Sequence, residues 1–345
     1  MRTRILFVTQ QVDPAHPALA ATVPKVAALA ALVDEVVVLA DGGVEHALPP
    51  NCRVRTFRAS RRSGRGLRFE AALARELRGL RGGAVVAHMC PIYAVLAAPL
   101  VRPLRIPLLL WFTHWKASRL LRAAERVSTA VVSVDTRSFP LESRKVRAIG
   151  HGIDLGEFPC VAERPGADGL RLLALGRYSE AKGLEVVVRA VATVAGARLD
   201  VHGPALSEAE RRTRAELEQL VERLAVGGRV ALRDAVPRSG VPALFAEHDA
   251  LVNNMRAGAP DKVVYEAAAS CLPVLASNPV FDGLLDADQR FDRADLDGLA
   301  ERIRALAALP AEERARLGAH LRERVREGHS VDSWARGVLE AAGIR

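Results

Sequence analysis

Two basic residues, Arg177 and Lys182, bracket a short loop in the segment LLALGRYSEAKG, residues 172–183. The apolar run before the loop is typical of a buried strand, and Gly183 begins an amphipathic helix. Only 5 of the 49 basic residues are lysines, yet Lys182 and Lys262 both follow predicted strands near helix starts. A guanidinium, an ammonium and a helix N-terminus there suit an anionic diphosphate. The alternative, two surface cations beside a helix start, is electrostatically unfavourable.

The segment 258–277, GAPDKVVYEAAASCLPVLAS, carries a second group of charges. Asp261, Lys262 and Glu266 lie at or on a predicted helix. Glu266 follows Lys262 by four residues, which allows an ion pair along the helix, in the weaker of the two orientations. The alternative is that the Glu266 carboxylate accepts hydrogen bonds from two ligand hydroxyls. The spacing leaves both interpretations open.

Polar residues also end predicted strands in the first half of the chain. Thr9 and Gln10 end the first strand, and His114 directly follows the strand at 108–112. Because the carboxyl ends of parallel strands face the ligand crevice, these side chains are candidates for a site. For His114 the alternative is a half-buried ring held by a backbone carbonyl.

The tetrad HGID, residues 151–154, follows the last predicted strand of the first half. It is interpreted first as a turn in which Gly152 has a positive φ. The alternative is that His151 and Gly152 line the wall of a cleft.

Other site chemistries lack their motifs. The histidines show no metal-ligand spacing, and no GxGxxG follows a strand, which argues against a dinucleotide oxidoreductase. P-loop and GxSxG motifs are also absent from the sequence. The sequence therefore predicts no metal site and no bound cofactor.

The four cysteines, Cys52, Cys90, Cys160 and Cys271, are widely spaced and form no CxxC. We expect them to be small buried hydrophobic residues in a reducing compartment. The N-terminus, MRTRILFVTQ, is typical of a first strand rather than a signal peptide. The longest apolar run is too short to span a bilayer, so we expect a cytoplasmic protein that is soluble or at most peripheral to the membrane.

The net charge is +9, and the segment from Arg53 to Arg81 holds ten arginines with only Glu70 and Glu76 as acids. This patch suits an anionic membrane face or a phosphorylated substrate. A general preference of the chain for arginine explains it more simply. With only two aromatic residues, the segment does not suit nucleic acid binding.

Short apolar segments alternate with amphipathic helical segments along the chain, which is typical of open α/β sheets. Length favours two domains. The predicted strands are Ile5–Val8, Val36–Leu39, Val85–Ala87, Leu108–Phe112 and Val131–Val134, then Leu172–Leu175, Leu199–Val201, Val230–Leu232, Ala250–Val252 and Val274–Ala276. Two predicted helices present apolar faces formed by Leu184, Val187, Val188 and Val191 and by Leu217, Leu220, Val221 and Leu224.

The sequence places one domain at 1–155, a linker rich in proline and glycine at 156–169, and a second domain at 170–330. A cleft is expected between the domains. The last helix, in 331–345, carries Trp334 and Val338 on one face, and the sequence leaves open whether it packs back on the first domain.

Several segments together resemble a retaining glycosyltransferase of family 4, which has the GT-B architecture. They are GRYSEAKG (176–183), LDVHGPA (199–205), the segments 229–252 and 261–277, HGID (151–154) and His114. The resemblance implies two Rossmann-like doubly wound domains facing across a cleft, the first for the acceptor and the second for a nucleotide-sugar donor.

The resemblance also implies roles for individual residues. Arg177 and Lys182 match the pair that holds the donor diphosphate, and Glu266 matches the second acid of an E-x7-E motif that binds ribose hydroxyls. His114 matches a cleft histidine near the donor sugar. The implied catalytic residues are His114, Arg177 and Lys182; the implied donor-binding residues add Arg233, Val236, Asp261, Lys262, Val263 and Glu266; the implied acceptor or cleft residues are Thr9, Gln10, His151 and Gly152.

Two positions depart from the family pattern. The first acid of E-x7-E falls at Gly258, and Asp261, Lys262 or backbone N–H groups are the candidates to replace it. The loop at 10–20, QQVDPAHPALA, lacks the glycine-rich turn of many relatives, so acceptor handling is expected to differ.

The implied reaction transfers a hexosyl or N-acetylhexosaminyl group, from a donor assumed to carry uridine diphosphate, to an acceptor hydroxyl with retention and without a metal. The acceptor is left open among a lipid-linked sugar, a glycan end and a small metabolite, and so is the oligomeric state. The alternatives are a GT-B epimerase, which the missing acid disfavours, and a donor-binding protein without transferase activity, which Gly258 favours.

Overall fold

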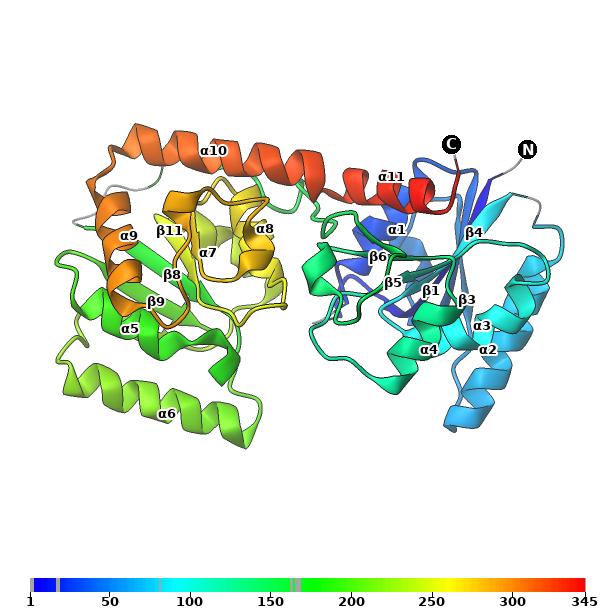
Figure 1. Cartoon of the computed structure of the whole chain (residues 1–345), viewed down its shortest axis with the longest axis horizontal. Helices are drawn as coiled ribbons and strands as arrows, with labels where there is room; N and C mark the ends of the chain where they lie inside the picture. Colours follow the sequence, from blue (N-terminus) through cyan, green and yellow to red (C-terminus); the bar gives the residue numbers. More distant parts are fainter. Residues whose placement is uncertain (1–2, 17–18, 81, 162–163, 165–168, 345) are drawn as a thin grey trace. The chain divides into compact units, whose positions relative to one another are not determined.

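The computed structural model describes residues 3–16, 19–80, 82–161, 164 and 169–344. It divides into two compact units, shown with their elements in Figure 1. The first unit consists of residues 1–154 and 328–345, and the second of residues 155–327. The segment predicted as a linker, 156–169, is thus counted with the second unit, and its residues 162–163 and 165–168 lie outside the described residues.

The first unit contains a seven-stranded parallel sheet in the order β3-β2-β1-β4-β5-β6-β7. Its strands are β1 (Arg4–Val12), β2 (Glu35–Gly43), β3 (Cys52–Thr56), β4 (Gly83–His88), β5 (Leu108–Trp111), β6 (Ala130–Ser133) and β7 (Val146–Ala148). The sequence pattern missed β3 and β7. These edge strands are short and mostly not buried, so they lack the continuous apolar run of a central parallel strand.

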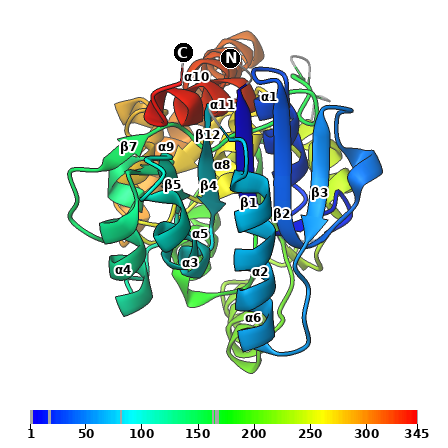
Figure 2. The same ribbon diagram turned by 90° about the vertical axis from the view of Figure 1, so that its right-hand side faces the viewer.

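Helices cover this sheet. Figure 2 shows α2 (Arg62–Leu77), α3 (Pro91–Val101) and α4 (Arg119–Val127), of which α3 contacts both others. The helices α1 (Thr22–Ala30) and α11 (Val331–Ala341) pack against each other. Trp334 of α11 is fully buried, and its ring lies edge-on to Trp111, with 5.7 Å between centroids. The last helix therefore packs within the first unit.

The second unit contains a five-stranded parallel sheet in the order β10-β9-β8-β11-β12. Its strands are β8 (Arg171–Leu175), β9 (Arg198–His202), β10 (Val230–Arg233), β11 (Ala250–Asn253) and β12 (Val274–Ala276). The helices are α5 (Leu184–Ala192), α6 (Glu208–Arg223), α7 (Val241–Glu247), α8 (Lys262–Ala269), α9 (Leu296–Ala308) and α10 (Ala311–Gly328). The prediction of two Rossmann-like domains is confirmed.

The core of the second unit uses the predicted apolar faces. Leu184, Val187, Val188 and Val191 of α5 are buried, as are Leu217 and Leu220 of α6, whereas Val221 and Leu224 are partly buried against the same core. Because the chain leaves β8 toward β9 on one side and β11 toward β12 on the other, the strand order reverses between β8 and β11. The carboxyl ends of these two strands are where ligands bind in such sheets.

The cysteine prediction is wrong for one pair. Cys160 and Cys271 form a disulfide, although 111 residues separate them in the sequence. Cys52 and Cys90 are free and buried, and burial raises the pKa of the Cys90 thiol to about 12. None of the helices in the described part of the chain combines the length and hydrophobicity needed to cross a membrane.

Candidate functional site

Lys182 lies at the carboxyl edge of the second sheet, between β8 and β11. It ends a short 3-10 helix, and Gly183, with φ of 55°, then begins α5. The Lys182 ammonium donates to the carbonyl oxygen of Leu175 at 3.0 Å and forms an ion pair with Asp261, which precedes α8. The Lys182 side chain is only 12% exposed. The ion pair thus joins the loops after β8 and β11 at the point where the strand order reverses.

Asp261 is held by a second donor. Its Oδ2, which contacts Lys182, also accepts from Asn253 Nδ2 at 2.7 Å. Gly176, with φ of 134°, has no Cβ that would overlap the Lys182 ammonium. The glycine therefore permits the close approach of Lys182 to the end of β8.

Glu266 of α8 is 5% exposed and contacts two cations through one oxygen. Its Oε1 lies 2.8 Å from Lys262 Nζ and 3.0 Å from Arg238 Nη1. The ion pair with Lys262, one of the two interpretations of the spacing, is confirmed. Binding of ligand hydroxyls by Glu266 stays a prediction.

Arg238, which the sequence analysis missed, links Glu266 to the start of the second unit. Its guanidinium contacts both carboxylate oxygens of Glu157, at 2.6 and 2.7 Å. Burial alone lowers the pKa of Arg238, but Glu266 and Glu157 more than offset this effect and the net shift is upward. One arginine among many gives no sequence signal, and both its partners are distant in the chain.

Arg177 and Lys182 contact different acids. Arg177 is 63% exposed and lies 3.1 Å from Oε1 of Glu210, in the first turn of α6. Burial raises the pKa of Glu210, but backbone N–H donors of Ser207 and Leu206, with Arg177, outweigh it and the pKa is lowered. A diphosphate bound by both Lys182 and Arg177 must therefore compete with Glu210 for the guanidinium.

The loop after β10 lies at the same carboxyl edge. Arg233 is 54% exposed and lies 3.2 Å from Oδ1 of Asp200, and Val236 is partly exposed. The Arg233 carbonyl accepts from the hydroxyl of Tyr178 at 2.8 Å, which ties this loop to the loop after β8. Val263, in the first turn of α8, is buried.

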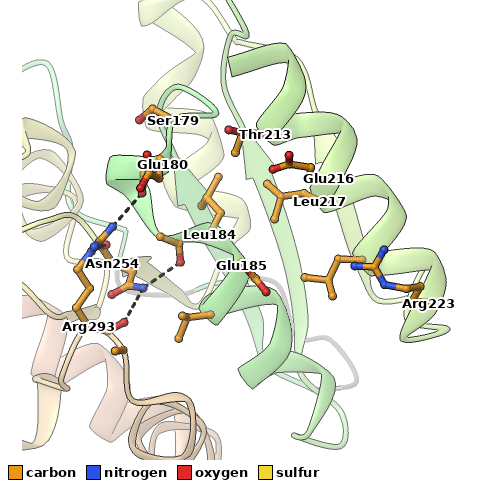
Figure 3. A pocket seen from close by; sticks show the side chains of 14 residues that line it. Ser179, Glu180, Leu184, Glu185, Thr213, Glu216, Leu217, Arg223, Asn254 and Arg293 are labelled. Atoms are coloured by element: carbon orange, nitrogen blue, oxygen red, sulfur yellow. Dashed lines mark hydrogen bonds between the residues drawn. The ribbon is translucent and has the colours of Figure 1, made fainter. Parts of the chain in front are cut away.

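A cavity of about 440 Å³ lies beside the loop that carries Lys182. Figure 3 shows the side chains that line it. Arg293 donates to the carbonyl of Glu180, and Asn254 donates to that of Gly183, at 2.9 Å each. Lys182 and Asp261 are not among the lining residues of the cavity. These contacts fix the Lys182 loop from one side.

In the first unit, β1 extends through Val12. The prediction that Thr9 and Gln10 end the strand is therefore wrong, since both lie within it. Thr9 is buried, with its hydroxyl 3.4 Å from His88 Nδ1, whereas Gln10 is exposed. The pairing of Gln11 and Val12 with Gly42 and Gly43 of β2 extends β1 beyond the apolar run Ile5–Val8.

His114 is exposed, and its Nδ1 accepts from the backbone N–H of Lys116 at 3.0 Å. The alternative of a half-buried ring held by a carbonyl is therefore wrong. The ring stacks on Trp115, with 5.5 Å between centroids. Desolvation by neighbouring groups, and then the charge of Lys116, lower the pKa of His114, which favours a neutral imidazole.

The turn predicted at HGID is confirmed for Gly152, whose φ is 77°. Its N–H and that of Ile153 donate to the carbonyl of His329, at 3.0 and 2.8 Å. A Cβ on Gly152 would lie 2.6 Å from Cε of Lys25. His151 precedes this turn within the first unit.

Comparisons with known proteins agree with this architecture. Residues 169–308 match the family Glycosyl transferases group 1. Sucrose-phosphate synthase from Thermosynechococcus elongatus is 19% identical, with a TM-score of 0.75 over 98% of each chain. A glycosyltransferase from Rickettsia africae is 13% identical, with a TM-score of 0.76 over 99% of this chain and 98% of that one. Anabaena HepE, solved in complex with UDP and glucose, is 17% identical, with a TM-score of 0.74 over 99% of each chain.

No curated protein matches this sequence. The fold is that of the GT-B glycosyltransferases, with two Rossmann-like domains built on parallel sheets. The segment that matches the Glycosyl transferases group 1 family, residues 169–308, lies within the second unit.

Proposed function

We propose that this protein is a retaining glycosyltransferase that uses a nucleotide diphosphate sugar, with uridine as the expected base. The observation that carries the proposal is the Lys182–Asp261 ion pair, which places an ammonium at the β8/β11 edge of a group 1 domain. HepE, a structural neighbour, was solved with UDP and glucose, which supports the choice of base and of a hexosyl group.

In the proposed mechanism, the donor diphosphate replaces Asp261 as the partner of Lys182. The leaving diphosphate gains negative charge as the glycosidic bond breaks, and a preorganised ammonium stabilises that charge. The N-terminus of α5, directly after Lys182, adds a partial positive charge. The proposed reaction therefore needs no metal.

Release from Lys182 gives Asp261 a second role in this mechanism. The family acid is missing at Gly258, and Asp261 lies three residues further, at the start of α8. Its freed carboxylate accepts hydrogen bonds from the transferred sugar. The acceptor hydroxyl attacks from the face that the diphosphate leaves, and a phosphate oxygen takes its proton, which gives net retention without a protein base.

A thermal-shift panel of UDP, GDP, ADP and dTDP tests the donor. A ligand at 100 times its Kd stabilises the folded state by about 2.7 kcal/mol, so the correct nucleotide raises Tm and the others do not. If none of the four raises Tm, the proposal is wrong. Gly258 favours one alternative, a protein that binds the donor without transferring the sugar. Slow hydrolysis of the donor in the absence of acceptor would identify an active transferase and exclude this alternative.

Glu266→Gln is expected to weaken UDP binding about tenfold or more, because hydrogen bonds to a charged group are each worth about 1.5–3 kcal/mol. Glutamine keeps the shape of the side chain but removes the charge that ribose hydroxyls and Arg238 contact. Isothermal titration calorimetry measures the affinity. Glu185→Gln, on the exposed face of α5, is the matched control, and an unchanged UDP affinity in Glu266→Gln would remove Glu266 from the site.

We also propose that the first unit contacts anionic membranes, where a lipid-linked acceptor would lie. Leu67 of α2 is 68% exposed, and Arg61, Arg62 and Arg68, at or near the same end of the helix, are exposed as well. Glu76, an acid of the same segment, is buried and paired with arginines, which removes its charge from the surface. An exposed leucine among arginines suits an anionic bilayer.

Leu67→Glu is expected to reduce cosedimentation with phosphatidylglycerol vesicles several-fold, because each charge near an anionic surface contributes about 1 kcal/mol. Leu206→Glu is the matched control, since Leu206 is 70% exposed in the second unit. Phosphatidylcholine vesicles should not bind either protein. If Leu67→Glu and Leu206→Glu lose vesicle binding to the same extent, α2 is not the membrane-contacting surface.

A further inference from the structure

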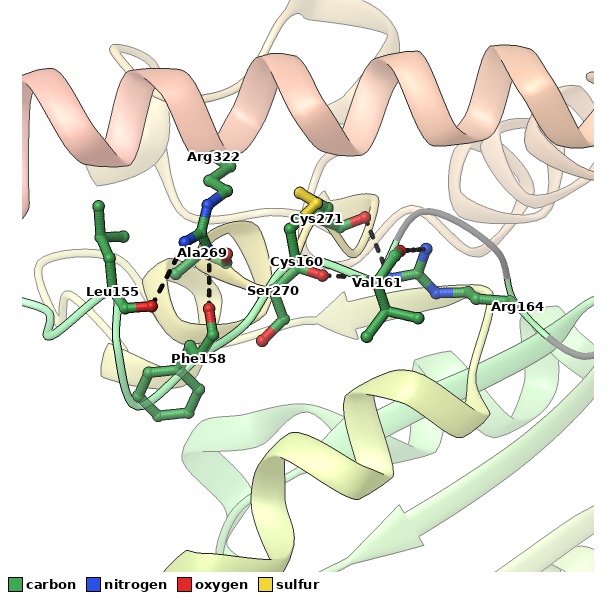
Figure 4. The surroundings of a disulfide bond; sticks show 9 residues. All are labelled: Leu155, Phe158, Cys160, Val161, Arg164, Ala269, Ser270, Cys271 and Arg322. Carbon is green, nitrogen blue, oxygen red and sulfur yellow. Dashed lines mark hydrogen bonds between the residues drawn. A yellow bond between two sulfur atoms is a disulfide. The ribbon is translucent and has the colours of Figure 1, made fainter.

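We propose that Cys160–Cys271 is a thiol–disulfide exchange site, and that its reduction by a dithiol loosens the segment 155–161 from α8 and weakens nucleotide binding. The exchange itself is independent of the proposed function, whereas the effect on nucleotide binding rests on it. Figure 4 shows the disulfide and the residues around it.

The two cysteines differ in exposure. Cys160 is exposed and lies shortly after the chain enters the second unit at Leu155, whereas Cys271 is 1% exposed and follows the end of α8. A thiolate of the incoming dithiol can therefore attack Cys160 Sγ, and the electron pair of the broken bond leaves on Cys271 Sγ, which takes a proton. The second thiol then displaces Cys160. The dithiol becomes a disulfide, and the protein gains two electrons and two protons.

A noncovalent link joins the same two segments. Arg238 bridges Glu157, three residues before Cys160, and Glu266, five residues before Cys271. The disulfide and this ionic link therefore attach the segment 155–161 to α8 at two places. Glu266 is the acid proposed to bind ribose. A displacement of Cys160 can therefore affect the position of Glu266 in two ways, through residues 157–160 and Arg238, and through Cys271 and residues 266–271.

Other contacts hold the segment when the disulfide is open. Arg322 of α10 donates to the carbonyls of Phe158, at 2.6 Å, and of Ala269, while Arg164 donates to the carbonyl of Cys271 at 3.1 Å. These hydrogen bonds do not involve sulfur. We therefore expect reduction to loosen the segment 155–161 without unfolding the second unit.

The test compares oxidised and dithiothreitol-reduced protein. Thiol titration of the denatured, unreduced protein is expected to find two free thiols, for Cys52 and Cys90, and four after reduction. Hydrogen exchange in peptides covering 155–161 and 262–275 is expected to quicken on reduction. UDP affinity is expected to fall about fivefold, at the low end of measured couplings between sites.

Cys160→Ser is expected to reproduce the reduced state and to lose the response to dithiothreitol, whereas Cys52→Ala keeps the response. Four free thiols in the unreduced protein, or unchanged hydrogen exchange on reduction, would overturn the exchange site. Faster exchange with unchanged UDP affinity would overturn the link to nucleotide binding. If neither form binds UDP, the proposed donor is wrong, and thiol titration and hydrogen exchange still decide the exchange site.

Discussion

Replacing Lys182 with alanine is expected to lower kcat about 100-fold or more, since a preorganised charge that stabilises a leaving group is worth that much. Lys182 is largely buried at the end of β8, so water cannot easily replace its ammonium. The loss should fall on kcat more than on KM, because the diphosphate gains charge only as the bond breaks. Steady-state kinetics measure both, and a loss smaller than threefold would contradict the diphosphate role.

Asp261→Asn is the informative companion to Lys182→Ala. Asparagine keeps the side-chain size and removes the charge that neutralises Lys182. If Asp261 also binds the transferred sugar, the variant should bind UDP more tightly yet turn over more slowly. Arg189→Ala, which removes an exposed cation of α5, is the control for a general change of charge and should leave kcat unchanged.

The central strands were predictable from sequence because parallel strands buried on both faces need continuous apolar runs, as in Leu172–Leu175. β3 escaped prediction because its sequence, CRVRT, places arginines at alternate positions of a sheet edge. The end of β1 was missed as well, because the polar residue Gln11 joins the strand through pairing with Gly42 of β2 and not through hydrophobicity.

The candidate site was predictable only in part. Lys182 and Asp261 are 79 residues apart, but each follows a strand. Because a parallel sheet brings the carboxyl ends of its strands to one edge, their common location could be predicted. Their direct pairing depends on side-chain geometry, which no spacing encodes. Arg238 and the Cys160–Cys271 disulfide depend on contacts over 28 and 111 residues, for which a single sequence offers no signal.

Gly318→Ala is expected to destabilise the second unit by about 2–3 kcal/mol, the cost of overpacking a well-packed interior. Gly318 is buried within α10, and a Cβ there would overlap the backbone carbonyl oxygen of Cys271. In an open helical position the same substitution stabilises by about 1 kcal/mol, so the packing determines the sign here. A backbone oxygen cannot move away by changing rotamer, and α10 must therefore shift from the end of α8.

Gly66→Ala in α2 is the matched control for this prediction. Its new Cβ would lie 3.7 Å from Leu96 Cδ1, an ordinary van der Waals distance, so this variant is expected to be as stable as the wild type or more stable. Urea unfolding followed by circular dichroism gives both free energies. A Gly318→Ala protein at least as stable as the wild type would mean that α10 does not pack on Cys271, and the contact that Arg322 makes from the same helix to Ala269 would then lose its support.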